Sequence, residues 1–421
     1  MIERHVANDF IDPLVTSIIR DDNLWELVES GIRPIVRDCI LPRAEEFAKN
    51  EEIPAEIYKL LGDSGFYGMS IPKEYDGLGY GTLGDCLVIF ETGYGDMSTS
   101  LLPLVTTSLF GRAVQIGGTE EQKERILPKI ASGELYGCYA LTESGGSSFA
   151  ESIRTRARKK GGRYVISGEK LFITNADYAN LGVVFARIEG TENGIGAFLV
   201  PNKDRLPEGY DNGNGYRVTG KLKGKPGLLA SATCTISMDS AEVPEEDVLG
   251  LDFQGGKGHG VAVKTLGLSR PTIAAQALGN AKRALSYVMQ YAAETPRGDG
   301  KINLLDLPLY RADLAMLTGK LIQNVSYLFG AAVSMDRGDI AKSDPLKVYS
   351  SMLKAIATDE ASEICRKAMG MLGGAGYSGE HPLGRIWRDS GVPPIYEGHN
   401  TLQLHHSGKF ISRHLKNLCQ E

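Results

Sequence analysis

GRYVISGEKLFITNA, residues 162–176, is the stretch in which the character of this sequence changes. Leu171 and Ile173 alternate here with Phe172 and Thr174. Because successive side chains of a strand point to opposite faces, we expect a strand with one face in a core and the other face available. An aromatic ring and a hydroxyl group on the available face would suit a flat heterocycle, and a half-buried strand without a ligand is the alternative.

Short runs of the same kind surround this stretch. They are rich in β-branched and aromatic residues, are separated by Gly, Asn and Asp, and extend from LYGCYALTE at residue 135 to SATCTISMDSAEVP, which ends at residue 244. Regularly spaced short strands of this composition are typical of a β-barrel or a sandwich.

The segments on either side have the periodicity of helices. LWELVESGIRPIVRDCILPRAEEFAKN (24–50) is helical with Pro34 and Pro42 as interruptions, and Thr119 begins a further helix as its N-cap. Three long helical patterns follow residue 258 and predict an antiparallel bundle. The sequence therefore predicts an α+β fold. Its parts are an N-terminal helical domain (1–135), a β-barrel domain (136–255) and a C-terminal four-helix bundle (256–421).

Composition restricts the class of protein. A chain of 421 residues is too long for one ordinary core, and its 42% hydrophobic and 23% charged residues are those of a soluble globular protein. The net charge of −6 argues against a nucleic-acid-binding surface. The six cysteines are scattered without zinc-ligand spacing, so we expect reduced thiols and no metal. No signal peptide and no run of eighteen apolar residues is seen, and we expect a cytoplasmic protein without a membrane span.

PPIYEGHNT (393–401) places one carboxylate, Glu397, between stiff, mostly apolar neighbours and a glycine. If this seat excludes water, the pKa of Glu397 rises and the residue becomes a candidate base. The alternative is a surface glutamate in a loop of proline and glycine.

Three further motifs carry weaker signals. LTESGGSS (141–148) offers hydroxyl groups and flexible backbone that can hold a phosphate or a ring oxygen, or it is a polar turn. Arg270 lies near the start of a mostly apolar helix, where it needs a partner such as a carboxylate across the bundle, unless it is on the surface. GAGYSG (374–379) matches a dinucleotide fingerprint, but it follows a helix and is better interpreted as the glycine turn that ends that helix.

In order along the chain, five segments resemble those of the acyl-CoA dehydrogenase family, and the resemblance covers nearly the whole sequence. The segments are YALTESGGSS, SGEKLFITNA, SRPTIAAQALGNAKRAL, MGMLGGAGY and RIWRDSGVPPIYEGHNTLQ. The resemblance implies an FAD-dependent dehydrogenase that introduces an α,β double bond into an acyl thioester, carried by CoA or by an acyl carrier protein. It also implies electron-transfer flavoprotein as the electron acceptor and a homotetramer.

The resemblance further assigns roles to residues. Glu397 is the base that removes the α-proton, and the β-hydrogen leaves as hydride to flavin N5. The family patterns assign contacts with FAD to Tyr139, Leu141, Thr142, Ser147, Ser148, Phe172, Thr174, Arg297, Gly373, Gly374, His399 and Thr401. Arg297 is included as a substitute for an arginine that this sequence lacks. Gly373 and Gly374 would approach the FAD of a neighbouring subunit. Substrate contacts are Ser148, Arg270, Tyr396 and Gly398, whose N–H would bind the thioester carbonyl.

The sequence also departs from the family pattern. In ETPRGDG (294–300), Thr295 stands where an arginine is expected and Gly298 where a phenylalanine is expected. Gly370 replaces a glutamine, and His399 replaces the usual threonine. The departures in ETPRGDG and MGMLGG motivate one alternative to the dehydrogenase, a relative that has lost flavin and acts as a binding or regulatory protein. A second alternative is an oxidase of the same fold, which the sequence does not distinguish from a dehydrogenase.

Overall fold

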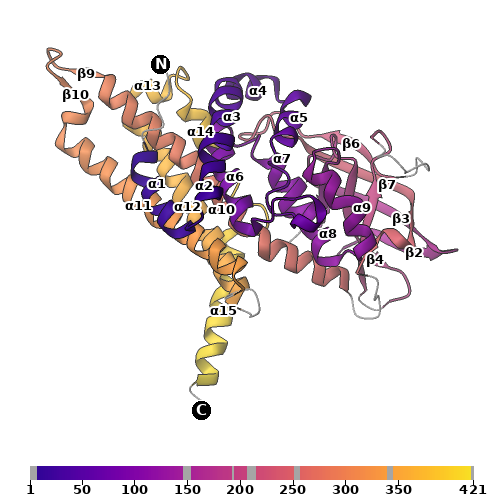
Figure 1. The fold of residues 1–421 in the computed structure, drawn as a ribbon. Coiled ribbons are helices and arrows are strands. Elements are labelled where there is room, and N and C mark those ends of the chain that lie inside the picture. The colour runs from indigo at the N-terminus through magenta and orange to yellow at the C-terminus, as the bar shows by residue number, and fades with distance from the viewer. Residues whose placement is uncertain are drawn as a thin grey trace.

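The computed structural model describes residues 7–145, 153–191, 194–205, 215–250, 257–338 and 345–418. Three groups of elements lie side by side (Figure 1): the N-terminal helices, in purple, occupy the middle, with the strands, in pink, on one side and most of the C-terminal helices, in orange and yellow, on the other. This order of helices, strands and helices confirms the predicted α+β fold.

The N-terminal helices are short and frequently change their winding. They are α1 (Asn8–Ile19), α2 (Asp22–Glu26), η1 (Leu27–Ile32), α3 (Arg33–Ile35), η2 (Val36–Ile40), η3 (Leu41–Arg43), α4 (Ala44–Asn50), α5 (Ala55–Asp63), η4 (Lys73–Tyr75), α6 (Gly81–Gly95), α7 (Leu101–Pro103), η5 (Leu104–Gly111), α8 (Arg112–Gly117) and α9 (Glu120–Ala131). The predicted interruptions fall in this series, because Pro34 lies in α3 and Pro42 in the tight turn η3. Thr119 caps α9 as predicted, and Gln122 completes the reciprocal capping box.

Helix α6 packs the N-terminal helices against the C-terminal bundle. It is buried on almost every side and crosses α10 (Lys257–Glu294) at the contact of two backbones. A Cβ atom on Gly279 of α10 would lie 2.1 Å from the carbonyl oxygen of Phe90, and one on Gly93 would lie 2.8 Å from that of Gln276. Only glycine permits this close approach.

The strands form one eight-stranded sheet. They are β1 (Gly137–Ala140), β2 (Arg156–Lys160), β3 (Arg163–Thr174), β4 (Leu181–Ile188), β5 (Ile195–Pro201), β6 (Arg217–Lys221), β7 (Thr233–Pro244) and β8 (Val248–Leu249). The order is β6-β7-β3-β2-β4-β5-β8, and β1 pairs with β4 in parallel. The predicted β-rich middle part is thus present, and its described strands follow an open path rather than the closed circuit of a barrel.

The two faces of the sheet contribute to different cores. Along β4, Val183 packs into the large core shared with the helices, and Val184 packs into a smaller core on the opposite face. This alternation is the period of two expected of strands. Both residues are fully buried because the sheet is covered on both faces here.

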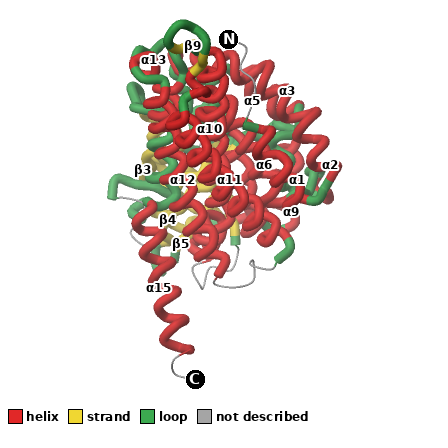
Figure 2. Tube along the Cα trace, turned by 90° about the vertical axis from the view of Figure 1, so that its left-hand side faces the viewer, coloured by secondary structure: helices red, strands yellow, loops and turns green. Residues whose placement is uncertain are grey.

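The C-terminal part is a bundle of long helices, with α10, α11 and α12 side by side in Figure 2. After α10 come the short hairpin β9 (Pro296–Arg297) and β10 (Ile302–Asn303), then α11 (Pro308–Asp336), α12 (Pro345–Met371), α13 (Gly374–Tyr377), α14 (Leu383–Asp389) and α15 (Asn400–Leu418). The end of α15 projects away from the body in both views (Figures 1 and 2). The predicted glycine turn is displaced: Leu372 and Gly373 form the turn that ends α12, and Gly374–Tyr377 of the GAGYSG segment form the short helix α13. A helix, not the strand of a dinucleotide-binding loop, precedes this segment.

The described residues lack a membrane-spanning helix, a metal-binding cluster and a disulfide. None of their helices combines the length and the apolar character that a membrane span requires. They also contain no group of three or more His, Cys, Asp and Glu side chains that could hold a metal ion. The five cysteines among them, Cys39, Cys86, Cys138, Cys234 and Cys365, form no disulfide.

Candidate active site

Glu397 lies in the turn between α14 and α15, and its backbone is left-handed. Its φ is 51°, and that of Gly398 is 94°. The left-handed conformation costs a residue with a Cβ about 1 kcal/mol or more, and residues held in it cluster at functional sites. Phe172, on β3, shares this property with a φ of 57°, so two predicted site residues are among the few side-chain-bearing residues in this region.

The two carboxylate oxygens of Glu397 have different surroundings. Oε2 accepts a hydrogen bond of 2.6 Å from Ser269 Oγ on α10, whereas Oε1 is buried and has no hydrogen-bond partner among the described residues. Burial raises the pKa of Glu397 to about 7, against the opposing effects of the Ser269 hydrogen bond and of the positive charges of Arg270 and Lys354. A pKa raised toward neutrality and one oxygen without a described partner leave this carboxyl group able to take a proton.

Arg270 is half-buried beside this turn but forms no ion pair with Glu397. Its Nη1 donates a hydrogen bond of 3.1 Å to Ser351 Oγ on α12, while Nε is buried and unpartnered within the described residues. The predicted carboxylate partner across the bundle is therefore wrong: a serine hydroxyl takes that place. The charge of Glu397 still acts on Arg270, opposing the lowering of its pKa by burial.

Tyr396 anchors the turn from its other side. Its hydroxyl donates a hydrogen bond to Gln276 Oε1 on α10. The Gln276 amide in turn donates to Met97 O and Ser100 Oγ, both at 2.9 Å. The residue before the base is thus tied through α10 to the segment that follows α6.

The predicted flavin residues gather on β1, on the loop after it and on β3. The backbone N–H of Leu171 donates a hydrogen bond of 2.9 Å to Thr142 O, which joins that loop to β3. Phe172 is 63% exposed, so its ring has a free face for a flat ligand. Thr174 is half-buried two residues further along β3.

Tyr139 connects these strands to the base. Its hydroxyl donates a hydrogen bond of 3.4 Å to Ala262 O on α10. Burial raises its pKa well above the ordinary value, and the negative charge of Glu397 adds to this rise. The structure therefore brings β1 and the Glu397 turn to the same place.

A buried ion pair behind the flavin residues was missed in the sequence. Lys170 Nζ on β3 donates hydrogen bonds to Glu143 Oε1 at 2.7 Å and to Leu141 O at 3.2 Å. Lys170 continues the inward alternation of Tyr164 and Ile166 along β3, and the register with β7 shifts after it, between Lys170 and Ile173, so that Phe172 is exposed and Ile173 is buried. That alternation was the signal in the sequence that could have revealed the lysine.

The other predicted residues are further apart. Arg297 is exposed on β9, and Gly373, with a φ of 62°, leads into α13 with open space where a Cβ would be, as does Gly374. His399 is exposed, and its Nδ1 accepts a hydrogen bond of 3.2 Å from Thr401 N. No described contact joins Arg297, Gly373 or Gly374 to the Glu397 turn. Ser147 and Ser148 lie outside the described residues.

These residues fit a bound flavin. An exposed aromatic ring on a strand, a neighbouring hydroxyl and a loop held by backbone hydrogen bonds form a wall on which a flat, polar-edged ring can lie. The base turn joins this wall through Tyr139. The site thus defines a class: a flavin-dependent enzyme in which a half-buried carboxyl group, that of Glu397, lies near the flavin residues.

Comparison with known proteins identifies the family. The chain matches the models of the acyl-CoA dehydrogenase N-terminal domain (residues 26–134), middle domain (138–241) and C-terminal domain (256–412). It is 33% identical over 379 residues to an acyl-CoA dehydrogenase of Bacillus subtilis, covering 90% of this chain and 95% of the relative. The chain belongs to the acyl-CoA dehydrogenase family.

Solved structures agree with this assignment. Butyryl-CoA dehydrogenase from Megasphaera elsdenii is 28% identical, with a TM-score of 0.83, and the match covers 93% of this chain and 98% of that one. A chain from a structure of the electron transferring flavoprotein of Acidaminococcus fermentans is 29% identical, also with a TM-score of 0.83, over 92% and 97% of the two chains. These similarities support an FAD-dependent acyl-CoA dehydrogenase, and they do not support the flavin-free binding protein considered above.

Proposed function

We propose that this enzyme oxidises an acyl-CoA at its α,β carbon–carbon bond, with Glu397 as the base that removes the α-proton. One observation carries this proposal: Glu397 Oε1 is buried and has no hydrogen-bond partner in the described part of the chain, while Oε2 is held by Ser269. A base needs one free oxygen, a fixed orientation and a pKa near the working pH, and the pKa of about 7 meets the last condition.

The residues around Glu397 would act mainly by position and charge. Ser269 holds the carboxylate, and Tyr396 ties the turn to α10. The N–H of Gly398 is the proposed donor to the thioester carbonyl, which gains negative charge as the α-proton leaves. A fixed donor in a dry site stabilises such charge more than water does.

FAD is the proposed electron acceptor within the protein, and when bound it would take the β-hydrogen as hydride. The residues proposed to hold it are Tyr139, Leu141, Thr142, Ser147, Ser148, Phe172 and Thr174 of the same chain, with His399 and Thr401 beside the base. Arg297, Gly373 and Gly374 are proposed to contact the FAD of a neighbouring subunit, and their open positions on the bundle support this.

Two partners follow from the proposal. Electron-transfer flavoprotein is the proposed external acceptor, supported by the similar chain from the Acidaminococcus fermentans structure. Assembly into a homotetramer is supported by exposed apolar side chains on the bundle, such as Leu309 at 83% and Met316 at 60% on α11. Single apolar residues are common on surfaces, so the molar mass in solution has to decide this point.

The test is the visible spectrum of the FAD-loaded protein, mixed without oxygen with acyl-CoAs that differ in chain length and branching. Wild-type flavin bands are expected to bleach with one class of acyl-CoA, which also names the substrate. E397Q is expected to keep FAD and to bind the same acyl-CoA, but to bleach about 10² to 10⁴ times more slowly, the usual contribution of a general base.

The matched control is E363Q, which removes an exposed carboxylate of α12 that pairs with Arg366. It is expected to bleach at the wild-type rate. Equal rates for E397Q and the wild type would contradict the assignment of the base. An enzyme that consumes oxygen at its turnover rate would instead be an oxidase.

A further inference from the structure

Beyond the family's base, the structure places a second charged residue on α12 against the same turn. We infer that Lys354 is a positioning residue for Glu397: its buried ammonium group fixes the turn that carries the base and supplies positive charge to it. The inference rests on the proposed function, because it concerns the titration and the geometry of the proposed base.

The first argument is geometric. Lys354 is fully buried, and its Nζ donates hydrogen bonds to Gly398 O at 2.9 Å and to Asn400 Oδ1 at 2.8 Å. The Asn400 amide nitrogen donates back to α12, to Ala355 O at 3.1 Å, Thr358 Oγ1 at 2.9 Å and Asp359 Oδ1 at 2.7 Å. Helix α12 thus binds the residues on both sides of His399, directly after the base.

This attachment matters because the turn is unfavourable on its own. Glu397 and Gly398 are successive left-handed residues, and a Cβ on Gly398 would lie 2.0 Å from the amide nitrogen of Gln403. The same amide donates a hydrogen bond of 3.4 Å to Glu397 O. In a trans peptide the C=O and the next N–H point in opposite directions, so holding Glu397 O fixes the direction of Gly398 N–H. Lys354 holds the following peptide at Gly398 O.

The second argument is electrostatic. Both hydrogen-bond acceptors of Lys354 are neutral oxygens, and Arg270 Nη1 also donates to a neutral one, Ser351 Oγ. One buried and one half-buried cation, Lys354 and Arg270, therefore face the half-buried Glu397, and Asp359, which accepts a hydrogen bond from Asn400, is a second negative charge that acts on Lys354. Removing a charge that balances a buried cation is costly. The pKa shifts agree: Lys354 and Arg270 both lower the pKa of Glu397, and Glu397 opposes the burial that lowers the pKa of Lys354 to about 8.

The groups that face Glu397 come from four parts of the chain. Helix α10 contributes Ser269 and Arg270, α12 contributes Lys354, β1 contributes the neutral hydroxyl of Tyr139, and the turn contributes Tyr396. Only Arg270 and Lys354 among them carry charge at neutral pH, so Lys354 supplies one of the two positive charges that favour the ionised form of Glu397.

The same charge serves the next step of the proposed reaction. The substrate's α-C–H bond breaks, the proton moves to Glu397 Oε1, and the electron pair stays on the substrate as an enolate-like charge. Glu397 is then neutral, and the positive charges of Lys354 and Arg270 face the new negative charge. Preorganised charge of this kind lowers the barrier without reorganisation.

The test separates geometry from charge with three variants of the FAD-loaded enzyme. K354R keeps both the donor and the charge, K354Q keeps a donor but removes the charge, and K354M removes both. The measured quantity is the rate constant of anaerobic flavin bleaching at saturating acyl-CoA between pH 5.5 and 9.5. K367M is the matched control, because Lys367 is an exposed residue of the same helix that pairs with Glu363.

In K354Q, the pKa seen in this pH profile is expected to rise by about one unit, because one of two opposing charges is lost. The rate at pH 7 is then expected to fall about fivefold, in proportion to the ionised fraction of Glu397, and to recover partly above pH 8.5. K354M is expected to show the same shift and a lower plateau, K354R a profile close to the wild type, and K367M an unchanged one. A K354Q profile that coincides with the wild type, or that is lowered equally at every pH, would overturn the inference.

A thermal-unfolding cycle at pH 7.5 tests the same coupling without turnover. K354Q is expected to lower the melting temperature more in the wild type than in E397Q, where no carboxylate remains to be balanced. Equal losses in the two backgrounds would overturn the inference even if the enzyme is active. If the losses differ but no acyl-CoA bleaches the wild type, the proposed function fails while the coupling of Lys354 to Glu397 stands.

Discussion

The surroundings that suit Glu397 to its proposed role as base also destabilise the folded protein. Its pKa in the folded state is about 7, above the value of 4.5 for an ordinary glutamate. The folded state therefore holds the proton more tightly than the unfolded chain, and stability is lost as the pH rises from about 4.5 through 7. A glutamine at this position does not titrate and escapes the loss.

E397Q is accordingly expected to be more stable than the wild type at pH 8, by about 2 kcal/mol after an allowance for partial exposure of the residue. The melting temperatures of the FAD-loaded proteins, measured from pH 5 to pH 8, provide the check. The difference between them should grow with pH and flatten above about pH 7.5. A difference that does not change with pH would show that burial of the charge is not the cause.

Some features of individual site residues could be predicted from the sequence, and others could not. Glu397 could be found because its neighbours are stiff and mostly apolar, and because the family motif is local. Its left-handed backbone could not, since that depends on contacts made by Lys354 and Gln403. The roles of Lys170 and Lys354 were missed for a similar reason: each lysine binds partners that are distant in sequence, and burial of a lysine is improbable until those partners are known.

At the scale of elements, Glu143 closes the base of the loop that carries several proposed flavin contacts. Its Oε1 accepts hydrogen bonds from Lys170 Nζ at 2.7 Å, Thr155 Oγ1 at 2.6 Å and Thr155 N at 3.0 Å. Its Oε2 accepts one from Arg154 N at 2.6 Å. One carboxylate therefore joins β3 to the chain on both sides of the loop.

E143Q is expected to weaken FAD binding. The substitution leaves Lys170 buried without a counter-charge. Loss of a hydrogen bond between charged groups costs about 1.5 to 3 kcal/mol. If this whole cost falls on the FAD-bound form of the loop, the dissociation constant of FAD rises roughly 10- to 100-fold. Titration of the apoprotein with FAD, followed by flavin fluorescence, measures it. E169Q, which alters the exposed neighbour of Lys170 on β3, is the control and should bind FAD as the wild type does. Equal FAD affinity of E143Q and E169Q would refute the role of Glu143 in holding this loop.

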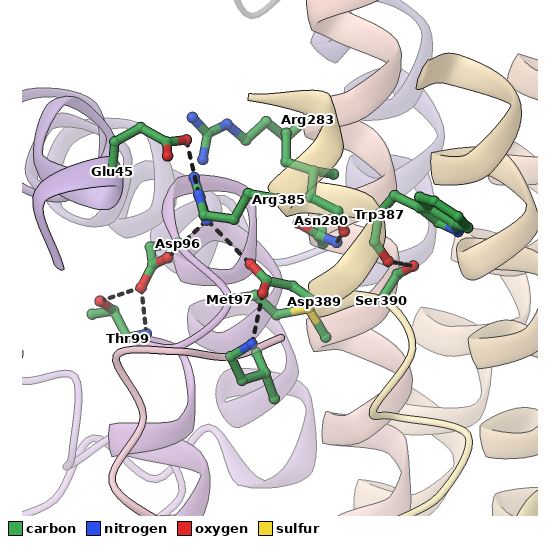
Figure 3. A network of polar contacts seen from close by, with 12 residues as sticks. Glu45, Asp96, Met97, Thr99, Asn280, Arg283, Arg385, Trp387, Asp389 and Ser390 are labelled. Carbon is green, nitrogen blue, oxygen red and sulfur yellow. Dashed lines mark hydrogen bonds and ion pairs between the residues drawn. The ribbon is translucent and has the colours of Figure 1, made fainter. Parts of the chain in front are cut away.

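For the whole molecule, the order of helices, strands and helices was predictable because the period of the apolar residues changes twice along the chain. The way the three parts are joined was not. Figure 3 shows one such junction around Arg385 of α14, which forms ion pairs with Glu45 of α4 at 2.8 Å, with Asp96 after α6 at 3.2 Å and with Asp389 at 3.1 Å. Asp389 Oδ1 also accepts a hydrogen bond of 2.6 Å from Leu228 N, in the segment between β6 and β7. No local pattern in the sequence predicts a contact between segments so far apart.

This junction leads to the last prediction. R385M removes the only side chain that joins Asp96 and Asp389 in this network and leaves two buried carboxylates without their cation, which typically costs about 3 to 5 kcal/mol. Burial raises the pKa of Asp389 to about 6 even with Arg385 present, so this carboxyl becomes neutral on acidification. The loss of stability in R385M should therefore be largest above pH 7 and smaller at pH 5. Urea unfolding at the two pH values measures it, with the exposed neighbour R388M as the control. Because α14 leads directly into the Glu397 turn, R385M should also slow flavin bleaching. If R385M and R388M lose equal stability, the ion pairs at this junction contribute little to holding the three parts together.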